Sequence, residues 1–559
     1  MNNSPTNMWI VIDEMPPGSM NFEKIGGIKI FRPRASNEVA LCVEAENNLR
    51  SEFEVGKYTD RETINRILKH QFSFFINLLN QLLPTLASLD FLRFLLTEYD
   101  KTSEIDRLYK NNQLNDDKEK WADLGPTIRR AIKYLAERVI LFRPVELPDV
   151  SDEIIIEATE KIWICAEELV KHYILSDQTF MIFPDDTIFE VNPVGNHNYW
   201  TLKINNNYAT EVRERIRIDT MNRDKFIHSP SFDLQSSEHE KILGDAFKNT
   251  MSLSYLEVLG TLRTFIDLAQ PPQEGFPIPF VHREQTLNLL ASYLNFPQPA
   301  IEQVIAGFSI SQSNLETEGR EIWKPKQEYR AFRRGIFEAP HSTGTHLIFS
   351  KAMAEESALQ LVGGIVFKDI PPEWRSDEVN VALETLSNEA GKWFEQVVLK
   401  NFEMVGVFGI KSMKNGIGQQ NKRITIPPDV GEIDYLGYSP CENLLVLCEC
   451  KMVRAGFEPK YFRDEIYEFV GSNTSYFKKF QRKIDWVRQN VNDICDALSS
   501  VRVHDVPITP TRIATVIVTL YPSIVSCFTT DFPCVSITEI MMGYKQNGNW
   551  PYKLGVLIC

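Results

Sequence analysis

The sequence has little cysteine and no uninterrupted apolar run long enough for a membrane span. Nine cysteines among 559 residues form a sparse, odd set, which argues against a disulfide framework and suits reduced thiols. The most apolar stretch, residues 72–96, predicts a buried helical hairpin, because it is interrupted by Asn77, Asn80, Gln81, Pro84, Asp90 and Arg93. Since no basic start precedes an apolar segment, we expect no secretory signal and a cytoplasmic protein without a membrane partner.

Several motifs of nucleotide binding and hydrolysis are also missing. The chain has no G-x-x-x-x-G-K-[ST] or G-x-G-x-x-G loop, no H-E-x-x-H helix and no G-x-S-x-G turn. Its nine histidines are scattered, and we interpret each as a surface or core residue. The common phosphate-loop, zinc-protease and serine-hydrolase sites are therefore excluded.

Acidic residues exceed basic ones, but not evenly along the chain. The net charge of −15 arises in the first 383 residues, which hold 41 basic and 56 acidic residues, whereas residues 384–559 hold 19 of each. Charge asymmetry of this kind indicates a division of labour. We predict a boundary at "IPPEWRSDE" and three regions: residues 1–235, an α+β region that senses or oligomerises; 236–379, a helical and mixed region; and 380–559.

Hydrophobic periodicity predicts a mainly helical N-terminal region with short strands, of the α+β class. Residues 60–178 and 237–310 show apolar residues at three- and four-residue spacing, as helices do. "VALCVEA", residues 39–45, and residues 179–220 instead show the composition and turns of strands.

An unusual set of charges lies in "GEIDYLGYSPCENLLVLCECK", residues 431–451. The stretch predicts two strands joined by a turn, with Glu432 and Asp434 on one face and Glu449 and Lys451 on one face of the partner. At the open end of this hairpin Asp434 and Glu449 converge beside Lys451. Because two carboxylates alone repel each other, we expect a divalent cation, and their oxygen ligands suit Mg²⁺ or Mn²⁺.

The neighbouring segments predict a helix before this hairpin, with a further helix and a buried strand after it. "VALETLSNEAGKWFEQVVLKNF", residues 381–402, carries Glu395 away from the centre of its apolar stripe. "NTSYFKKFQRKIDWVRQNVNDICDAL", residues 473–498, is a single predicted amphipathic helix, and "RIATVIVTLYPSIV", residues 512–525, reads as a central strand.

The D-x(14)-E-x-K arrangement behind a helix that carries Glu395 resembles the PD-(D/E)xK nucleases, over residues 380–559. The resemblance implies a C-terminal α/β domain of the restriction-endonuclease-like fold with a mixed central sheet. It implies that Asp434 and Glu449 bind the metal, that Lys451 is catalytic, and that Glu395 completes the metal shell. Glu389 competes with Glu395 for that last role, and Ile433 stands where the family often has proline.

The basic run "KKFQRK" offers contacts to DNA phosphates through Lys478, Lys479, Arg482 and Lys483. A solvated helix face explains the same run equally well, and both interpretations stay open.

The expected function is an Mg²⁺-dependent nuclease that hydrolyses DNA phosphodiester bonds. The acidic N-terminal region would regulate it through a protein partner or homo-oligomer contacts, by analogy with bacterial antiviral defence effectors. Two alternatives remain: a non-catalytic nucleic-acid-binding or interaction protein that keeps the fold, and a nuclease acting on RNA.

Overall fold

The computed structural model describes fourteen stretches of the chain: residues 21–142, 152–177, 187–194, 198–204, 208–229, 236–271, 277–316, 322, 327–417, 423–454, 459–471, 474–501, 508–527 and 532–556. Two compact units divide the chain: Met1–Ile204 with His239–Glu384, and Asn205–Glu238 with Thr385–Cys559. The α+β class predicted from the sequence is confirmed. The units differ from the predicted regions in that residues 205–238 pack with the C-terminal part.

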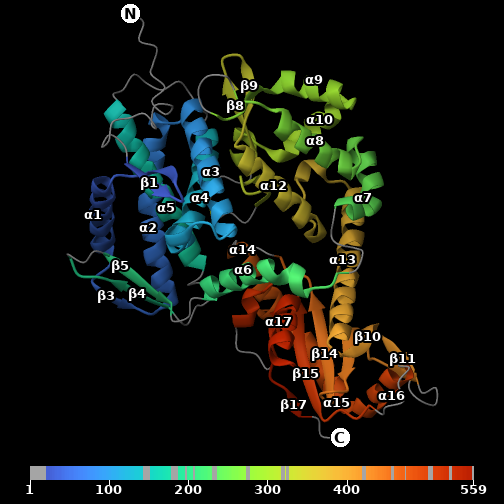
Figure 1. Ribbon diagram of the computed structural model, residues 1–559. Coiled ribbons are helices and arrows are strands. Elements are labelled where there is room, and N and C mark those ends of the chain that lie inside the picture. The colour runs from blue at the N-terminus through green and yellow to red at the C-terminus, as the bar shows by residue number, and fades with distance from the viewer. Residues whose placement is uncertain are drawn as a thin grey trace, which may run out of the picture. The chain divides into compact units, whose positions relative to one another are not determined.

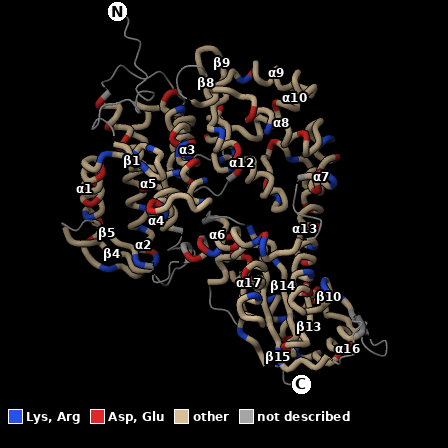
Figure 2. Tube along the Cα trace, viewed as in Figure 1, with Lys and Arg blue, Asp and Glu red and all other residues tan. Residues whose placement is uncertain are grey.

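The first unit opens with long helices that lie side by side (Figure 1). They are α1 (Ala35–Glu52), α2 (Arg61–Leu82), α3 (Leu89–Lys110), α4 (Lys118–Leu141) and α5 (Asp152–Asp177). The helical hairpin predicted for residues 72–96 is confirmed as part of α2 and α3. The strand predicted at residues 39–45 is wrong, because Leu41, Ala45 and Leu49 are buried at a four-residue spacing along α1. Figure 2 shows both signs of charge interspersed on these helices.

Short sheets and further helices complete this unit. The hairpin β1–β2 (Asn21–Ile25, Ile28–Arg32) and the sheet β3-β4-β5 (Gly56–Tyr58, Thr187–Val191, Trp200–Ile204) accompany the long helices. A second sheet has the order β6-β9-β8-β7 (Phe280–His282, Gly344–Ile348, Ile336–His341, Ser309–Ile310). The helices around it are α7 (Ser236–Met251), α8 (Tyr255–Leu268), α9 (Arg283–Leu294), α10 (Gln298–Phe308), α11 (Gln312–Asn314) and α12 (Lys351–Gly364). Among the described residues no helix is long and apolar enough to cross a membrane.

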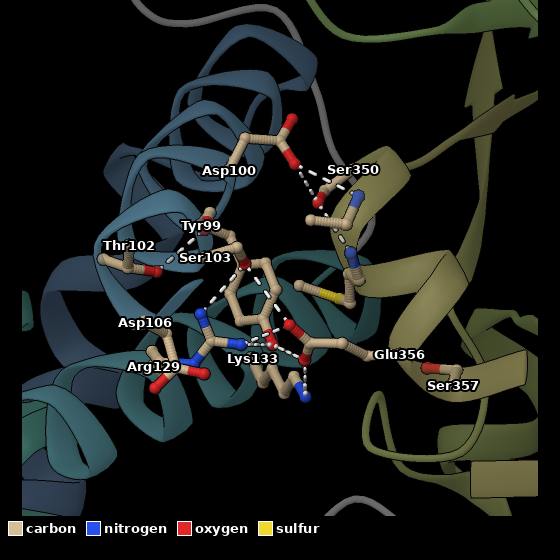
Figure 3. A network of polar contacts seen from close by, with 12 residues as sticks. Tyr99, Asp100, Thr102, Ser103, Asp106, Arg129, Lys133, Ser350, Glu356 and Ser357 are labelled. Atoms are coloured by element: carbon tan, nitrogen blue, oxygen red, sulfur yellow. Dashed lines mark hydrogen bonds and ion pairs between the residues drawn. The ribbon is translucent and has the colours of Figure 1, made fainter. Parts of the chain in front are cut away.

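A polar network ties α12 to α3 and α4 (Figure 3). Glu356 accepts a hydrogen bond of 2.5 Å from the Tyr99 hydroxyl and forms an ion pair with Arg129, while Lys133 Nζ lies 3.6 Å from Glu356 Oε2. Burial alone raises the pKa of Glu356, but Lys133 and Arg129 outweigh it and lower the pKa to about 2. The carboxylate is therefore ionised and fixes the helix in place.

The second unit is built on a mixed sheet with the order β10-β13-β14-β15-β16, and β17 pairs with β15. Its strands are β10 (Phe408–Met413), β13 (Ile433–Ser439), β14 (Leu444–Lys451), β15 (Arg512–Thr519), β16 (Cys534–Ser536) and β17 (Gly555–Val556), and β11 (Asn415–Ile417) pairs separately with β12 (Arg423–Thr425). β10, β13 and β14 are antiparallel neighbours, whereas β14, β15 and β16 run parallel. Strands β13 and β14 are buried along nearly their whole length, as central strands are.

Helices pack around this sheet. They are α6 (Tyr208–Phe226), α13 (Asp377–Met404), α14 (Pro459–Ile466), α15 (Tyr476–Gln489), α16 (Val491–Val501) and α17 (Ile537–Asn547). The boundary between the two units falls within α13. The single helix predicted for residues 473–498 is in fact two, because Asn490 ends α15 with a non-helical backbone (φ −121°, ψ 26°). Helix α6 lies beside α17 (Figure 1), although it precedes the rest of this unit by more than 150 residues. The strand prediction for residues 179–220 is wrong over the part that α6 covers.

Candidate functional site

The hairpin β13–β14 brings the predicted acidic and basic side chains together. Its register pairs Tyr435 with Cys448, so the next residues outward, Asp434 and Glu449, lie on the opposite face of the sheet. Both carboxylates are buried. Cys448 and Cys450 are also buried, in the cluster on the face that Tyr435 shares.

Lys451 links the two carboxylates on one side. Its Nζ lies 2.8 Å from Glu449 Oε1 and 3.3 Å from Asp434 Oδ2. Burial by itself lowers the pKa of Lys451, but Glu449 and Asp434 outweigh it and raise the pKa above its usual value. The backbone N–H of Cys450 also donates to Asp434 Oδ2 at 2.8 Å. The predicted juxtaposition of the acids and the lysine is therefore present, with the lysine charged.

Lys483 on α15 supplies a second ammonium group to the same carboxylates. Its Nζ donates to Glu449 Oε2 and lies 3.6 Å from Asp434 Oδ1. The sequence left open a phosphate contact and a solvated helix face for this lysine, but its side chain is buried in the cluster. A signal was available: Lys483 falls on the same helical stripe as Phe480, Ile484 and Val487, which are all buried.

Glu395 lies near the cluster, and Glu389 does not. The half-buried Glu395 on α13 accepts a hydrogen bond from the Ser412 hydroxyl. Burial raises its pKa, the Ser412 bond opposes this, and the negative charges of Asp434 and Glu432 raise it further. Glu389 is exposed and pairs with Lys392 at 2.7 Å. Of the two helix acids left open by the sequence, Glu395 is therefore the one whose pKa responds to the charges of the site. Ser412 was not predicted.

Asp434 and Glu449 have the chemistry and the placement to share a cation. The Lys483 ammonium contacts one oxygen of each, so both carboxylates already converge on a single positive charge. Carboxylate oxygens are the ligands that Mg²⁺ and Mn²⁺ prefer. Within the described part of the chain, however, no three His, Cys, Asp or Glu side chains are grouped so as to hold a metal. The geometry thus offers two ligands, with Glu395 outside the group.

The remaining residues of the basic run are more exposed than Lys483. Lys478 and Arg482 are exposed, and Lys479 is half-buried with its Nζ 5.7 Å from the centre of the Tyr476 ring. Lys451 Nζ lies 5.0 Å from the centre of the same ring. Tyr476 therefore stands between the cluster and the basic part of α15.

A helix-turn-helix arrangement lies in the first unit, but its second helix is covered. Helices α9 and α10 are joined by three residues, of which Asn295 is left-handed (φ 56°). The Trp374 indole donates to the carbonyl of Gln303 on α10 at 3.1 Å, and the Gln303 amide donates to the carbonyl of Glu373 at 2.7 Å. Helix α10 also contains no Lys or Arg. It lacks the exposed cationic face with which such a helix enters a DNA groove.

Three of the scattered histidines gather on the sheet of the first unit. The ring of His346 lies 5.2 Å from that of His282 and 4.9 Å from that of His341. His282 Nε2 contacts the carbonyl of Thr343 at 2.9 Å, and His282 Nδ1 faces the N–H of Gln285 at 3.4 Å. Because both ring nitrogens of His282 are engaged, the trio does not present three lone pairs to a metal. Only the tertiary structure brings these histidines together.

Comparisons with known proteins give no function that could be carried over to this chain. No protein-family model, no curated protein and no solved structure matches the chain.

Proposed function

We propose that the second unit is a metal-dependent nuclease that hydrolyses DNA phosphodiester bonds. The observation that carries the proposal is the convergence of Asp434 and Glu449, from two central strands, on shared cations with Lys451 beside them. Such a set suits phosphoryl chemistry, which needs charge neutralised on the phosphate and a water held in line. The sheet order and the helix with Glu395 support a restriction-endonuclease-like fold for residues 385–559.

Each residue of the set has a distinct role in this proposal. Asp434 and Glu449 would hold Mg²⁺ or Mn²⁺, and Glu395 would hydrogen-bond a water of its shell, since Ser412 already orients its carboxylate. When bound, the ion supplies charge neutralisation and acidifies a water molecule. Lys451, held by Glu449 and by the carbonyl of Cys450 at 3.1 Å, presents its ammonium to the attacking water or to a non-bridging phosphate oxygen.

Contacts to the substrate would come from α15. The exposed Lys478 and Arg482 and the half-buried Lys479 lie on this helix and would neutralise backbone phosphates of DNA. The first unit carries the excess acidic charge, and we propose that it regulates the nuclease through a protein partner or a second copy of the chain. A role in antiviral defence stays a prediction by analogy, and activity on RNA stays an alternative to activity on DNA.

A second candidate function is supported by the charge balance of the cluster. Two carboxylates and two ammonium groups neutralise each other without any metal. Buried ion clusters of this kind also occur as purely structural features. The second candidate is therefore a non-catalytic protein that keeps the fold and binds nucleic acid or a protein partner.

Plasmid cleavage by the purified full chain separates the two candidates. The nuclease should nick or linearise supercoiled DNA with Mg²⁺ or Mn²⁺, lose activity in excess EDTA and with Ca²⁺, and lose it in Asp434→Asn. Lys392→Met, an exposed lysine on α13, is the matched control and should cleave normally. Undiminished cleavage in EDTA would remove the metal from the proposal. Cleavage of RNA instead of DNA would favour the RNA alternative, and absence of cleavage of either would favour the non-catalytic candidate.

A further inference from the structure

The four carboxylate oxygens of Asp434 and Glu449 divide into two pairs. On one side, Asp434 Oδ2 and Glu449 Oε1 face Lys451, and Asp434 Oδ2 also accepts from the N–H of Cys450. On the other side, Asp434 Oδ1 and Glu449 Oε2 face Lys483. Within the described chain, Lys483 is the shared partner of this second pair. A metal shared by both carboxylates would therefore take the side that Lys483 now faces, since Lys451 and the Cys450 N–H face the other.

The two lysines are held differently. Lys451 also donates to the carbonyl of Cys450 at 3.1 Å and lies against the ring of Tyr476, so it has anchors besides the carboxylates. Lys483 reaches the cluster from α15, and its ion pairs are with Glu449 and Asp434. A lysine stem is flexible, and its ammonium can move away by rotation of the side chain alone.

The net charge of the cluster also favours displacement of one lysine when a metal ion binds. The cluster of two carboxylates and two ammonium groups is already neutral, and three of its four members, Asp434, Glu449 and Lys483, are buried. Addition of a divalent cation with both lysines in place would leave two uncompensated positive charges in a buried site, which is strongly unfavourable.

We propose that Lys483 is an internal counter-ion that occupies the metal position, and that a divalent cation binds only by displacing it. The proposal rests on the metal-dependent function proposed above. Lys483 thereby acts as a positioning residue: it keeps Asp434 and Glu449 converged in the metal-free protein and sets how much metal is needed to load the site. Its removal should favour metal binding and disfavour the metal-free fold.

The test measures Mn²⁺ binding to the full chain by titration calorimetry without nucleic acid. Lys483→Met should bind Mn²⁺ at least tenfold more tightly than the wild type. Arg488→Met, at an exposed position near the end of the same helix, is the control and should bind it as the wild type does. In EDTA, Lys483→Met should melt at a lower temperature than either, and Mn²⁺ should restore more of its stability. The double variant Glu449→Gln/Lys483→Met should lose the gain, which locates the ion.

Equal or weaker Mn²⁺ binding by Lys483→Met would overturn the proposal, as would absence of Mn²⁺ binding in both proteins. If Lys483→Met does not fold, Lys483→Gln replaces it, because its amide can still donate to a carboxylate while the charge is gone. The proposed nuclease activity fails separately: it is lost if the wild type does not cleave plasmid or RNA, even when Lys483→Met shows the tenfold gain in Mn²⁺ affinity.

Discussion

Arg215 of α6 holds Glu539 of α17 through two parallel hydrogen bonds of 2.6 and 2.9 Å, although 324 residues separate them. The same helix buries Asp219, which accepts a hydrogen bond of 2.6 Å from the Ser536 hydroxyl. Paired, planar contacts of this kind fix position as well as charge. The predicted catalytic region, residues 380–559, therefore lacks one helix of its own unit.

This relationship predicts how truncated proteins behave. Residues 385–559 alone should be insoluble or melt without cooperativity. Without α6, the apolar surface that packs against Val212 would be exposed to water, and so would Glu539 and Ser536, the partners of Arg215 and Asp219. A fusion of residues 205–238 to 385–559 through a flexible linker should show a cooperative thermal transition. Circular dichroism melting of both proteins checks this. Equal melting temperatures would show that α6 contributes little to the fold.

The cluster of Asp434, Glu449, Lys451 and Lys483 predicts a stability effect that the sequence did not. Crowded carboxylates alone suggest that removal of one relieves repulsion. Here each is paired, so Glu449→Gln leaves two buried ammonium groups to share the single carboxylate of Asp434 and should cost about 3–5 kcal/mol in free energy of unfolding. The double variant Glu449→Gln/Lys483→Met should recover part of this loss. Denaturant unfolding in EDTA of both variants and of Lys483→Met gives the coupling energy, and additive costs would contradict the pairing.

We predict that removal of the Lys451 ammonium group lowers the cleavage rate far more than it weakens metal binding. Lys451→Met removes a positive charge next to the reacting phosphate, and loss of one such preorganised group commonly costs about 100-fold or more in rate. The measurement is single-turnover plasmid cleavage at saturating Mg²⁺, with Mn²⁺ affinity measured in parallel. Retained metal binding with a large loss of rate is the expected outcome. A parallel loss of both would instead make Lys451 a support for the metal ligands.

We predict that removal of the Arg334 guanidinium strongly destabilises the first unit. Its fully buried guanidinium pairs with Glu373 through bonds of 3.0 and 2.9 Å and also donates to the carbonyls of Ala306 and Ser309 at 3.0 Å. Arg334→Met removes these hydrogen bonds and the partner of the Glu373 carboxylate, and it should cost about 3–5 kcal/mol. Arg107→Met, an exposed arginine paired with its helix neighbour, is the control and should leave the melting temperature unchanged. Similar melting temperatures for both variants would refute this.

We predict that the free energy of unfolding depends on pH through the buried carboxyl group of Asp100. Burial raises the pKa of Asp100 to about 6, opposed by hydrogen bonds from the Ser350 hydroxyl and the Ala352 N–H. The folded chain then holds a proton that the unfolded chain releases above the ordinary pKa of 3.8. The free energy of unfolding should therefore fall by between about 1 and 3 kcal/mol as the pH rises from about 4 to about 6.

Asp100→Asn should lack this fall, since the amide oxygen can still accept both bonds and cannot ionise. Asp60 gives a control of opposite sign, because hydrogen bonds from Thr63 lower its pKa. The stability that Asp60 adds is present above its ordinary pKa and is lost in acid. Denaturant midpoints of the wild type, Asp100→Asn and Asp60→Asn between about pH 2 and pH 8 test both signs, because the Asp60 loss falls below its ordinary pKa of 3.8. A wild-type profile parallel to that of Asp100→Asn would contradict the prediction.

The sequence alone was sufficient to place Asp434, Glu449 and Lys451 on one face of a hairpin. Side chains alternate along a strand, so the period of two put these three on one side and Cys448 and Cys450 on the other. It also indicated the helices of residues 60–178, because apolar spacing along one segment is a local property. It failed at residues 39–45, where a short apolar run fits a helix and a strand equally well.

Only the tertiary structure decided that Lys483 turns inward, that Ser412 orients Glu395, and that α6 joins the second unit. The partners in these contacts are 34, 17 and 324 residues apart in the chain. Such contacts depend on how whole elements pack, and packing is driven by non-directional burial of apolar surface. A lysine in a basic run has the same local sequence whether it faces a phosphate or a buried carboxylate; the electrostatic partner supplied by another element decides between them.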